Sequence, residues 1–277
     1  MLAGMVKKFA PAGCRIAEFD LPDFDLTNCD QVMTVLRAGG FDTIINCAAY
    51  THVDGCEAEE ALATRVNGDG PGFLAEAALA SSATLVHVST DYVFSGTAAA
   101  PYAEDAPVGP QTAYGRSKLA GEEAILNSGL PRYFIVRTSW LFGQGGKNFV
   151  ETILRLAGER DELGIVADQV GSPTFTADLA TAIYSLLSTR TYGVYHFANS
   201  GQCSWFDFAA EITRQAKRLG LLERTPLIKP LTTEEFPLPA RRPAYSVLAT
   251  DKVRAATAIN IPTWQDALER YLVMRNR

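Results

Sequence analysis

The stretch "TLVHVSTDYVF", residues 84–94, decides the fold class of this chain. Its first half is nearly all apolar, as expected for a parallel strand that is covered on both faces. Further strand patterns occur at 14–19, 43–49, 132–140 and 193–198, with helical patterns between them. Strands that alternate with helices predict βαβ units and therefore an α/β fold with a Rossmann-like, doubly wound parallel sheet.

The helical patterns and the prolines predict how the chain is divided. The patterns cover roughly 28–38, 57–80, 112–127, 147–158, 176–188, 204–219 and 263–273. The stretch 224–246 carries five prolines and cannot be a regular helix, so we expect a small C-terminal substrate lobe there. We predict a dinucleotide-binding core at 1–145. Residues 146–277 should add later core strands and helices and the substrate-binding lobe.

Composition narrows the class of protein. The 277 residues carry a net charge of −6 without a basic stripe, which argues against a nucleic-acid partner. No apolar run is long enough to span a membrane, and we expect no membrane partner. The five cysteines form no C-x-x-C pair, so we expect reduced thiols in a cytoplasmic protein. The three histidines are scattered, and we predict no metal site.

A second short motif, "YGRSK" at 114–118, gives the chain its chemistry. Tyr114 and Lys118 are four residues apart, so their side chains are neighbours on one face of a helix. A phenol has a pKa near 10, and a nearby ammonium favours the phenolate and lowers that pKa. Such a tyrosine can exchange a proton with an alcohol or carbonyl oxygen. Thr90, at the end of the strand, could bond the same oxygen.

These motifs and seven other stretches resemble the extended short-chain dehydrogenases/reductases, and among them the dTDP-4-dehydrorhamnose reductase family. The matching stretches are "FDLTN" (24–28), "TIINCAAYTHVDGCEAE" (43–59), "VNGDGPGFLAEA" (66–77), "LVHVSTDYVFSGT" (85–97), "PYAEDAPVGPQTAYGRSKLAGEEAI" (101–125), "RTSWLFGQGGKNFV" (137–150), "DQVGSPTFTADLA" (168–180), "SWFDFA" (204–209) and "ARRPAYSVL" (240–248). The resemblance therefore runs nearly end to end.

The resemblance implies reduction of the C4 keto group of dTDP-4-dehydro-L-rhamnose with NADPH or NADH. By resemblance, Tyr114 is the general acid, and Lys118 lowers its pKa and holds the nicotinamide ribose. Thr90 would bind the C4 oxygen of the substrate. The further substrate contacts implied by resemblance are Asp91, Trp140, Arg241 and Arg242, the two arginines lying against the diphosphate.

The resemblance also implies where the dinucleotide would lie. Besides Tyr114 and Lys118, the cofactor-binding residues would be Ala3, Asp20, Asp25, Leu26, Ala48, Ala49 and Tyr50. Asp20 should end a strand and accept from a ribose hydroxyl, where a carboxylate commonly lies in such folds. Ala3 would stand at the third glycine of the family's glycine-rich turn, which binds the pyrophosphate at a helix N-terminus.

The opening "MLAGMVKKFA" is typical of a helix and differs from the family pattern. The resemblance places the first strand and most of the glycine-rich turn upstream of Met1, so we expect both to be missing from this chain. Either a longer native form exists, or this form binds the dinucleotide weakly.

Three alternatives have the same or a related fold. A 4,6-dehydratase needs a second acid where Tyr92 stands, which favours simple reduction. An epimerase must hold its cofactor tightly through a turnover, which the atypical start disfavours. A non-catalytic relative, a regulatory subunit of a methionine adenosyltransferase, would not need Thr90, Tyr114 and Lys118. We also expect a nucleotide-sugar substrate and a possible homodimer.

Overall fold

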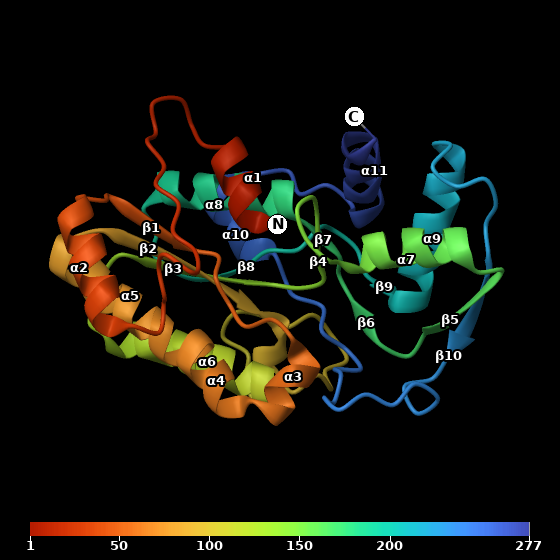
Figure 1. Cartoon of the computed structure of the whole chain (residues 1–277), viewed down its shortest axis with the longest axis horizontal. Helices are drawn as coiled ribbons and strands as arrows, with labels where there is room; N and C mark the ends of the chain where they lie inside the picture. Colours follow the sequence, from red (N-terminus) through yellow and green to blue (C-terminus); the bar gives the residue numbers. More distant parts are fainter. Residues whose placement is uncertain (277) are drawn as a thin grey trace.

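The centre of the molecule is a parallel four-stranded sheet with the order β1-β2-β3-β8 (Figure 1). The computed structural model describes residues 1–276. The strands are β1 (Thr43–Asn46), β2 (Thr84–Thr90), β3 (Tyr133–Thr138) and β8 (Gly193–His196). Each lies within or close to a predicted strand, and the predicted α/β class with a parallel sheet is confirmed.

Helices cover both faces of this sheet, which is why its central strands are apolar throughout (Figure 1). One face carries α2 (Cys29–Gly39), α5 (Gly70–Ser81) and α6 (Ala113–Asn127), and the other carries α1 (Leu2–Lys8), α8 (Thr176–Thr189) and α10 (Asp251–Thr257). Successive strand residues point to opposite faces. Leu85 and Ile135 accordingly lie in the core below α5, whereas Val86 and Val136 lie in the core below α8.

The segment between β1 and β2 is less regular than predicted. In place of one helix over 57–80, the chain forms α3 (Val53–Ala58), α4 (Glu60–Thr64), the π-turn η1 (Arg65–Asp69) and then α5. Glu59 interrupts the first helical run with a φ of −125°. A π-turn inside a helix is uncommon and often lies at a functional site.

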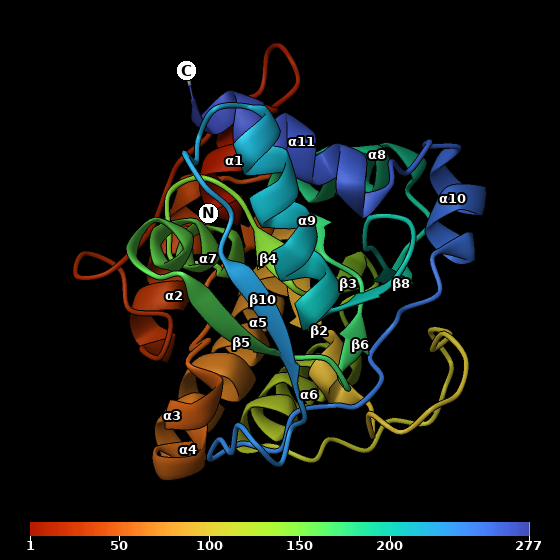
Figure 2. The same ribbon diagram turned by 90° about the vertical axis from the view of Figure 1, so that its right-hand side faces the viewer.

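A smaller lobe lies beside the sheet (Figures 1 and 2). It contains α7 (Phe149–Glu159), α9 (Trp205–Arg218) and the parallel pair β5 (Glu162–Val166) and β10 (Leu227–Leu231), and α11 (Trp264–Arg275) packs against α9. Short strand pairs connect lobe and sheet: β4 (Leu141–Phe142) with β7 (Thr174–Phe175), and β6 (Val170–Gly171) with β9 (Cys203–Ser204). The proline-rich stretch 224–246 contains no helix, as predicted, but it does contain β10.

The predicted strand at 14–19 is wrong. This segment is irregular and exposed, and the side chains of Ile16 and Phe19 are 42% and 43% accessible. A strand needs partners for its backbone groups. Within residues 1–276, β1 pairs with β2 alone, so the segment joins no ladder. Asp20 therefore does not follow a strand.

The buried centre of β3 provides a test of this architecture. Ile135 is fully buried, and its replacement by Ala leaves a cavity between the sheet and α5. We expect Ile135→Ala to lower the free energy of unfolding by about 2–5 kcal/mol in urea denaturation. Leu126→Ala, at an exposed position of α6, is the control and should change that free energy by about 0.5 kcal/mol or less. Equal losses in both variants would contradict this core.

Candidate active site

The site forms where the end of β2 meets the first turn of α6. The hydroxyl of Thr112 caps α6 by accepting from the backbone N–H of Gly115 at 3.0 Å. Gly115 has no side chain because a Cβ there would lie 2.3 Å from the carbonyl oxygen of Tyr92. This close approach brings Tyr114 beside the residues that follow β2.

Tyr114 is half-buried, and its ring lies edge-on to that of Tyr92 at a centroid distance of 5.5 Å. Burial raises the pKa of Tyr114 above its ordinary value, and a hydrogen bond with Thr90 opposes this only in part. The sequence predicted the opposite direction. The difference arises because the phenol loses solvation and faces the negative charge of Asp91, so Tyr114 keeps its proton at neutral pH.

Lys118 lies one turn further along α6 and is 2% accessible. Its Nζ donates to the carbonyl oxygen of Val88 at 2.7 Å and lies 3.2 Å from Nε2 of His87. Burial lowers the pKa of Lys118 to about 8, although the carboxylate of Glu122 opposes the shift. The amine is thus held between α6 and β2 and titrates close to neutral pH.

Thr90 and Asp91 complete the cluster. The Thr90 hydroxyl donates to Oδ1 of Asp91 at 2.9 Å and accepts from the backbone N–H of Tyr92 at 3.2 Å. The Oδ2 atom of Asp91 is buried and accepts no hydrogen bond from residues 1–276. Burial raises the pKa of Asp91 to about 6, while the hydroxyls of Ser246 and Thr90 lower it. An orphaned buried oxygen beside Thr90 is suited to a ligand's hydroxyl group.

Two residues that the sequence did not single out connect the site to β1. Asn67, in the π-turn η1, accepts from the backbone N–H of Tyr50 at 2.8 Å and donates to the hydroxyl of Ser117 at 3.0 Å. That hydroxyl in turn donates to the carbonyl oxygen of Tyr114 at 2.8 Å. Asn67 thereby links the loop after β1 to the first turn of α6. The sequence predicted one helix over 57–80 and gave no signal for the role of Asn67.

A buried ion pair supports the same cluster from below. Arg137 on β3 donates to Oε2 of Glu122 at 2.7 Å, and both side chains are almost fully buried. Ser89, next to Thr90, donates to the same carboxylate at 2.5 Å. Removal of one partner from such a pair costs about 3–5 kcal/mol, because the other charge is left buried and unpaired. The pair therefore fixes the spacing of β2, β3 and α6.

The predicted adenosine-side residues are only partly brought to the site. Ala48 and Ala49 follow β1, and Ala48 is exposed. Asp20 lies in the exposed loop, and its Oδ1 accepts from the next backbone N–H at 2.9 Å. Ala3 is exposed on α1. These last two residues do not join the cluster around Tyr114.

Asp25 and Leu26 are occupied by local contacts. Oδ1 of Asp25 accepts from both the backbone N–H and the hydroxyl of Thr27 at 2.8 Å, and these bonds lower the pKa of Asp25. Leu26 is buried, and a Cβ at Gly70 would lie 2.6 Å from its side chain. Leu26 thus packs against the start of α5.

The predicted substrate-side residues fall into two groups. Arg242 donates to Asp54 at 2.6 Å and to the hydroxyl of Tyr92 at 3.4 Å, which brings it next to the cluster. Arg241 is exposed. Trp140 stacks on Trp205 with a centroid distance of 3.5 Å and has a φ of 48°. A bulky residue in this left-handed region is uncommon and is often found at a functional site.

The residues present fit the nicotinamide end of a dinucleotide. The hydroxyl of Thr90 and the free oxygen of Asp91 lie with Tyr114 at the carboxyl end of β2, where α/β folds bind cofactors, and the amine of Lys118 lies against β2 one helix turn further on. The predicted absence of the family's first strand and glycine-rich turn stays a prediction.

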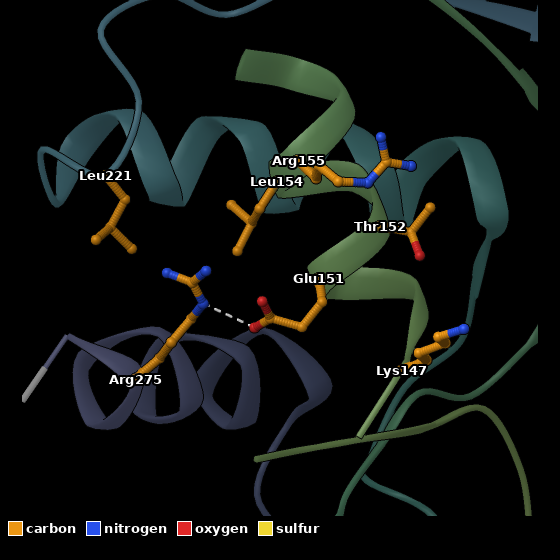
Figure 3. Close-up of a pocket in the computed structure, with 7 residues that line it drawn as sticks. All are labelled: Lys147, Glu151, Thr152, Leu154, Arg155, Leu221 and Arg275. Atoms are coloured by element: carbon orange, nitrogen blue, oxygen red, sulfur yellow. Dashed lines mark hydrogen bonds and ion pairs between the residues drawn. The ribbon is translucent and has the colours of Figure 1, made fainter. Parts of the chain in front are cut away.

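One surface hollow lies away from this cluster. It has a volume of about 790 Å³ and lies between α7 and α11, next to the ion pair of Glu151 and Arg275 (Figure 3). None of the residues that line it is one of the predicted site residues.

Within residues 1–276, no group of three or more His, Cys, Asp or Glu side chains is arranged to hold a metal ion. None of the helices described is long and apolar enough to cross a membrane.

Fold and site together define an oxidoreductase of the short-chain dehydrogenase/reductase class. The family model described as "RmlD substrate binding domain" matches residues 3–276. The chain therefore belongs to the RmlD family, as the sequence predicted.

Individual relatives agree with this assignment. The chain is 42% identical over 260 residues to a dTDP-4-dehydrorhamnose reductase of Aggregatibacter actinomycetemcomitans, which covers 92% of this chain and 88% of that protein. It is 45% identical over 235 residues to the spore coat polysaccharide biosynthesis protein SpsK of Bacillus subtilis, which covers 85% and 80%. A crystal structure of dTDP-4-dehydrorhamnose reductase from Bacillus anthracis in complex with NADP superposes with a TM-score of 0.93. It is 40% identical and covers 99% of this chain and 95% of that one.

The raised pKa of Asp91 predicts a pH dependence of stability. The folded protein binds the Asp91 proton more tightly than the unfolded chain, whose carboxyl has the ordinary pKa of 3.8. Stability is therefore lost as the pH rises from about 4 to about 6, by about 3 kcal/mol in total. Asp91→Asn cannot ionise and escapes this loss.

The comparison is made by urea denaturation at about pH 4 and about pH 7.5, on either side of this window. We expect the stability of Asp91→Asn, relative to the unchanged protein, to improve by about 3 kcal/mol between the two pH values. Asp23→Asn, at an exposed position, is the control and should show no such trend. A constant difference between Asp91→Asn and the unchanged protein would contradict the burial of a charged Asp91.

Proposed function

We propose that this protein reduces the C4 keto group of a dTDP-4-keto-6-deoxy sugar, dTDP-4-dehydro-L-rhamnose, with NADPH or NADH. The observation that carries the proposal is the cluster of Thr90, Tyr114 and Lys118 at the end of β2 in a chain of the RmlD family. The names of the relatives and the NADP complex of the B. anthracis reductase support the same reaction.

Tyr114 acts as the proton donor. Because burial raises its pKa, the phenol is neutral and holds the proton that the substrate's C4 oxygen needs. The reduced nicotinamide supplies the hydride when it is bound. Donation leaves a phenolate on Tyr114, which the ammonium of Lys118 stabilises after Lys118 has turned toward the ribose. Thr90 holds the C4 oxygen beside Tyr114.

Asp91 and Arg242 bind the remainder of the substrate. The free Oδ2 of Asp91 accepts from a sugar hydroxyl. Arg242 is positioned by Asp54 and Tyr92, and its planar guanidinium suits a diphosphate. Arg241, which is exposed close by, and Trp140 belong to the same proposed surface. On the cofactor side we retain Ala48, Ala49 and Tyr50, with Asp25 and Leu26 at the adenine.

Reduction is favoured over dehydration by Tyr92. A dehydratase needs a carboxylic acid at this position. The phenol of Tyr92 cannot take that role, and its hydroxyl accepts a hydrogen bond from Arg242 at 3.4 Å.

The homodimer, the cytoplasmic location and the choice between NADPH and NADH stay predictions. Sedimentation velocity tests the homodimer, and separate titrations with NADPH and NADH test the cofactor preference.

Replacement of Tyr114 tests the proposal directly. Tyr114→Phe removes the donated proton and little else, so we expect kcat for the reduction of dTDP-4-dehydro-L-rhamnose to fall about 100- to 10,000-fold. The oxidation of NADPH, followed by absorbance, measures the rate. Tyr133→Phe, at the opposite end of the sheet, is the matched control and should retain full activity. The proposal fails if Tyr114→Phe is as active as the unchanged protein, or if the unchanged protein reduces no 4-keto sugar nucleotide.

A further inference from the structure

The side-chain amide of Asn46 has a defined orientation. Asn46 is the last residue of β1 and is buried, and its Oδ1 accepts from the backbone N–H of Ala48 at 3.0 Å. The Nδ2 group must therefore point the other way, toward Nδ1 of His87, which lies 3.1 Å away. An amide nitrogen has only protons to offer, so Nδ1 of His87 has to accept.

This orientation selects one tautomer of His87. Burial and the nearby Lys118 hold the pKa of His87 well below its ordinary value, so the ring is neutral and carries a single proton. With Nδ1 accepting from Asn46, that proton belongs on Nε2. Nε2 faces Nζ of Lys118 at 3.2 Å.

An Nε2–H that points at Nζ requires a lone pair on Lys118. An uncharged amine provides one, and it still donates to the carbonyl oxygen of Val88 at 2.7 Å. A charged ammonium has no lone pair and would face the N–H of His87 with a proton of its own. The observed contacts therefore suit the uncharged form of Lys118. Protonation must either reverse the amide of Asn46, which breaks its bond to Ala48, or release Lys118 from His87.

We propose that His87 is a positioning residue that holds Lys118 in its uncharged form and releases it on protonation, and that Asn46 couples this switch to the backbone at Ala48. The proposal connects two sides of the site. Ala48 lies where the resemblance places the adenosine, and Lys118 lies where the nicotinamide ribose is expected. The functional meaning, release of Lys118 toward the ribose, rests on the proposed function.

The groups around Lys118 leave it as the one that titrates between neutral and mildly alkaline pH, where its pKa of about 8 falls. Glu122, on α6, forms the buried ion pair with Arg137. Burial raises the pKa of the Cys47 thiol, after β1, to about 12, and it raises that of Tyr114. His87, on β2, is neutral throughout.

The ring nitrogens of His87 can be observed by long-range ¹H–¹⁵N correlation in the ¹⁵N-labelled full chain, from about pH 6.5 to about pH 9.5. The chain has only three histidines, so His87→Gln assigns the signal. We expect the Nε2–H tautomer at high pH and a change in the His87 signals and the Ala48 amide signal with one midpoint near the pKa of Lys118. Lys118→Met should abolish that titration.

His196 is an internal control, because its contacts select the opposite tautomer. Its Nδ1 lies 3.1 Å from the carbonyl oxygen of Tyr102, which can only accept, and its Nε2 faces a guanidinium nitrogen of Arg137 at 3.4 Å. His196 should therefore be the Nδ1–H tautomer at every pH tested. The same spectrum thus has to show two buried histidines with different tautomers.

Asn46→Asp is the sharpest variant because it changes one atom of the chain of hydrogen bonds. A carboxylate accepts from both Ala48 and His87, so the ring proton moves to Nδ1, and Nε2 becomes an acceptor for a charged Lys118. We expect the Nδ1–H tautomer throughout and a rise in the pKa of Lys118 of about 1–3 units. An Nδ1–H tautomer of His87 in the unchanged protein at high pH, or a pH-independent ring, would overturn the proposal.

NADPH binding tests the functional half separately. If a charged Lys118 holds the ribose, the dissociation constant of NADPH should fall as the pH is lowered through the pKa of Lys118. Asn46→Asp should move this pH dependence of NADPH binding to higher pH. If the His87 switch is present but NADPH does not bind, the proposed function fails and the role of His87 stands. If the dissociation constant of NADPH does not change around the pKa of Lys118, the proposal that Lys118 is released toward the ribose is wrong.

Discussion

The contact between the first turn of α6 and the end of β2 is the constraint on which the site depends. Gly115 leaves no room for a side chain against the carbonyl oxygen of Tyr92, so α6 can approach the strand end closely. This approach buries Tyr114 and Lys118 together with Thr90. It also brings Glu122, one turn later, into the ion pair with Arg137. A larger residue at position 115 would push the helix away and separate the groups whose proximity gives the site its chemistry.

The sequence predicted those features that are encoded locally. The apolar runs gave β1, β2, β3 and β8, and the spacing of Tyr114 and Lys118 placed both on one helix face. The strand pattern at 14–19 failed because a strand needs a neighbour to pair with, and none of the described residues provides one. The strand β10 was hidden because Pro230 is unusual in a strand and is tolerated here in an outer, two-stranded pair.

The contacts that define the site's electrostatics could not be predicted in this way. Asn67, Arg137 and the pair Asn46–His87 act through hydrogen bonds between residues that are far apart in the sequence. Their side chains look like ordinary polar residues in strands or helices. The direction of the pKa shift of Tyr114 failed for a related reason. Spacing along a helix shows which charge is near, but only the packed structure shows how much solvation is lost.

Burial acts in opposite directions on the two ionisable groups at the centre of the site, and this gives the site a preferred direction of proton transfer. It raises the pKa of the Tyr114 phenol and lowers that of the Lys118 ammonium to about 8, because each loses solvation of its charged form. Before any ligand contributes, the most stable arrangement is therefore a protonated tyrosine, one helix turn from a lysine that can give up its charge. A site in this arrangement has a proton to donate and lacks a phenolate to accept one. It is poised for reduction of a carbonyl group, and oxidation of an alcohol would require the phenol to be ionised first, against the cost of burying its charge.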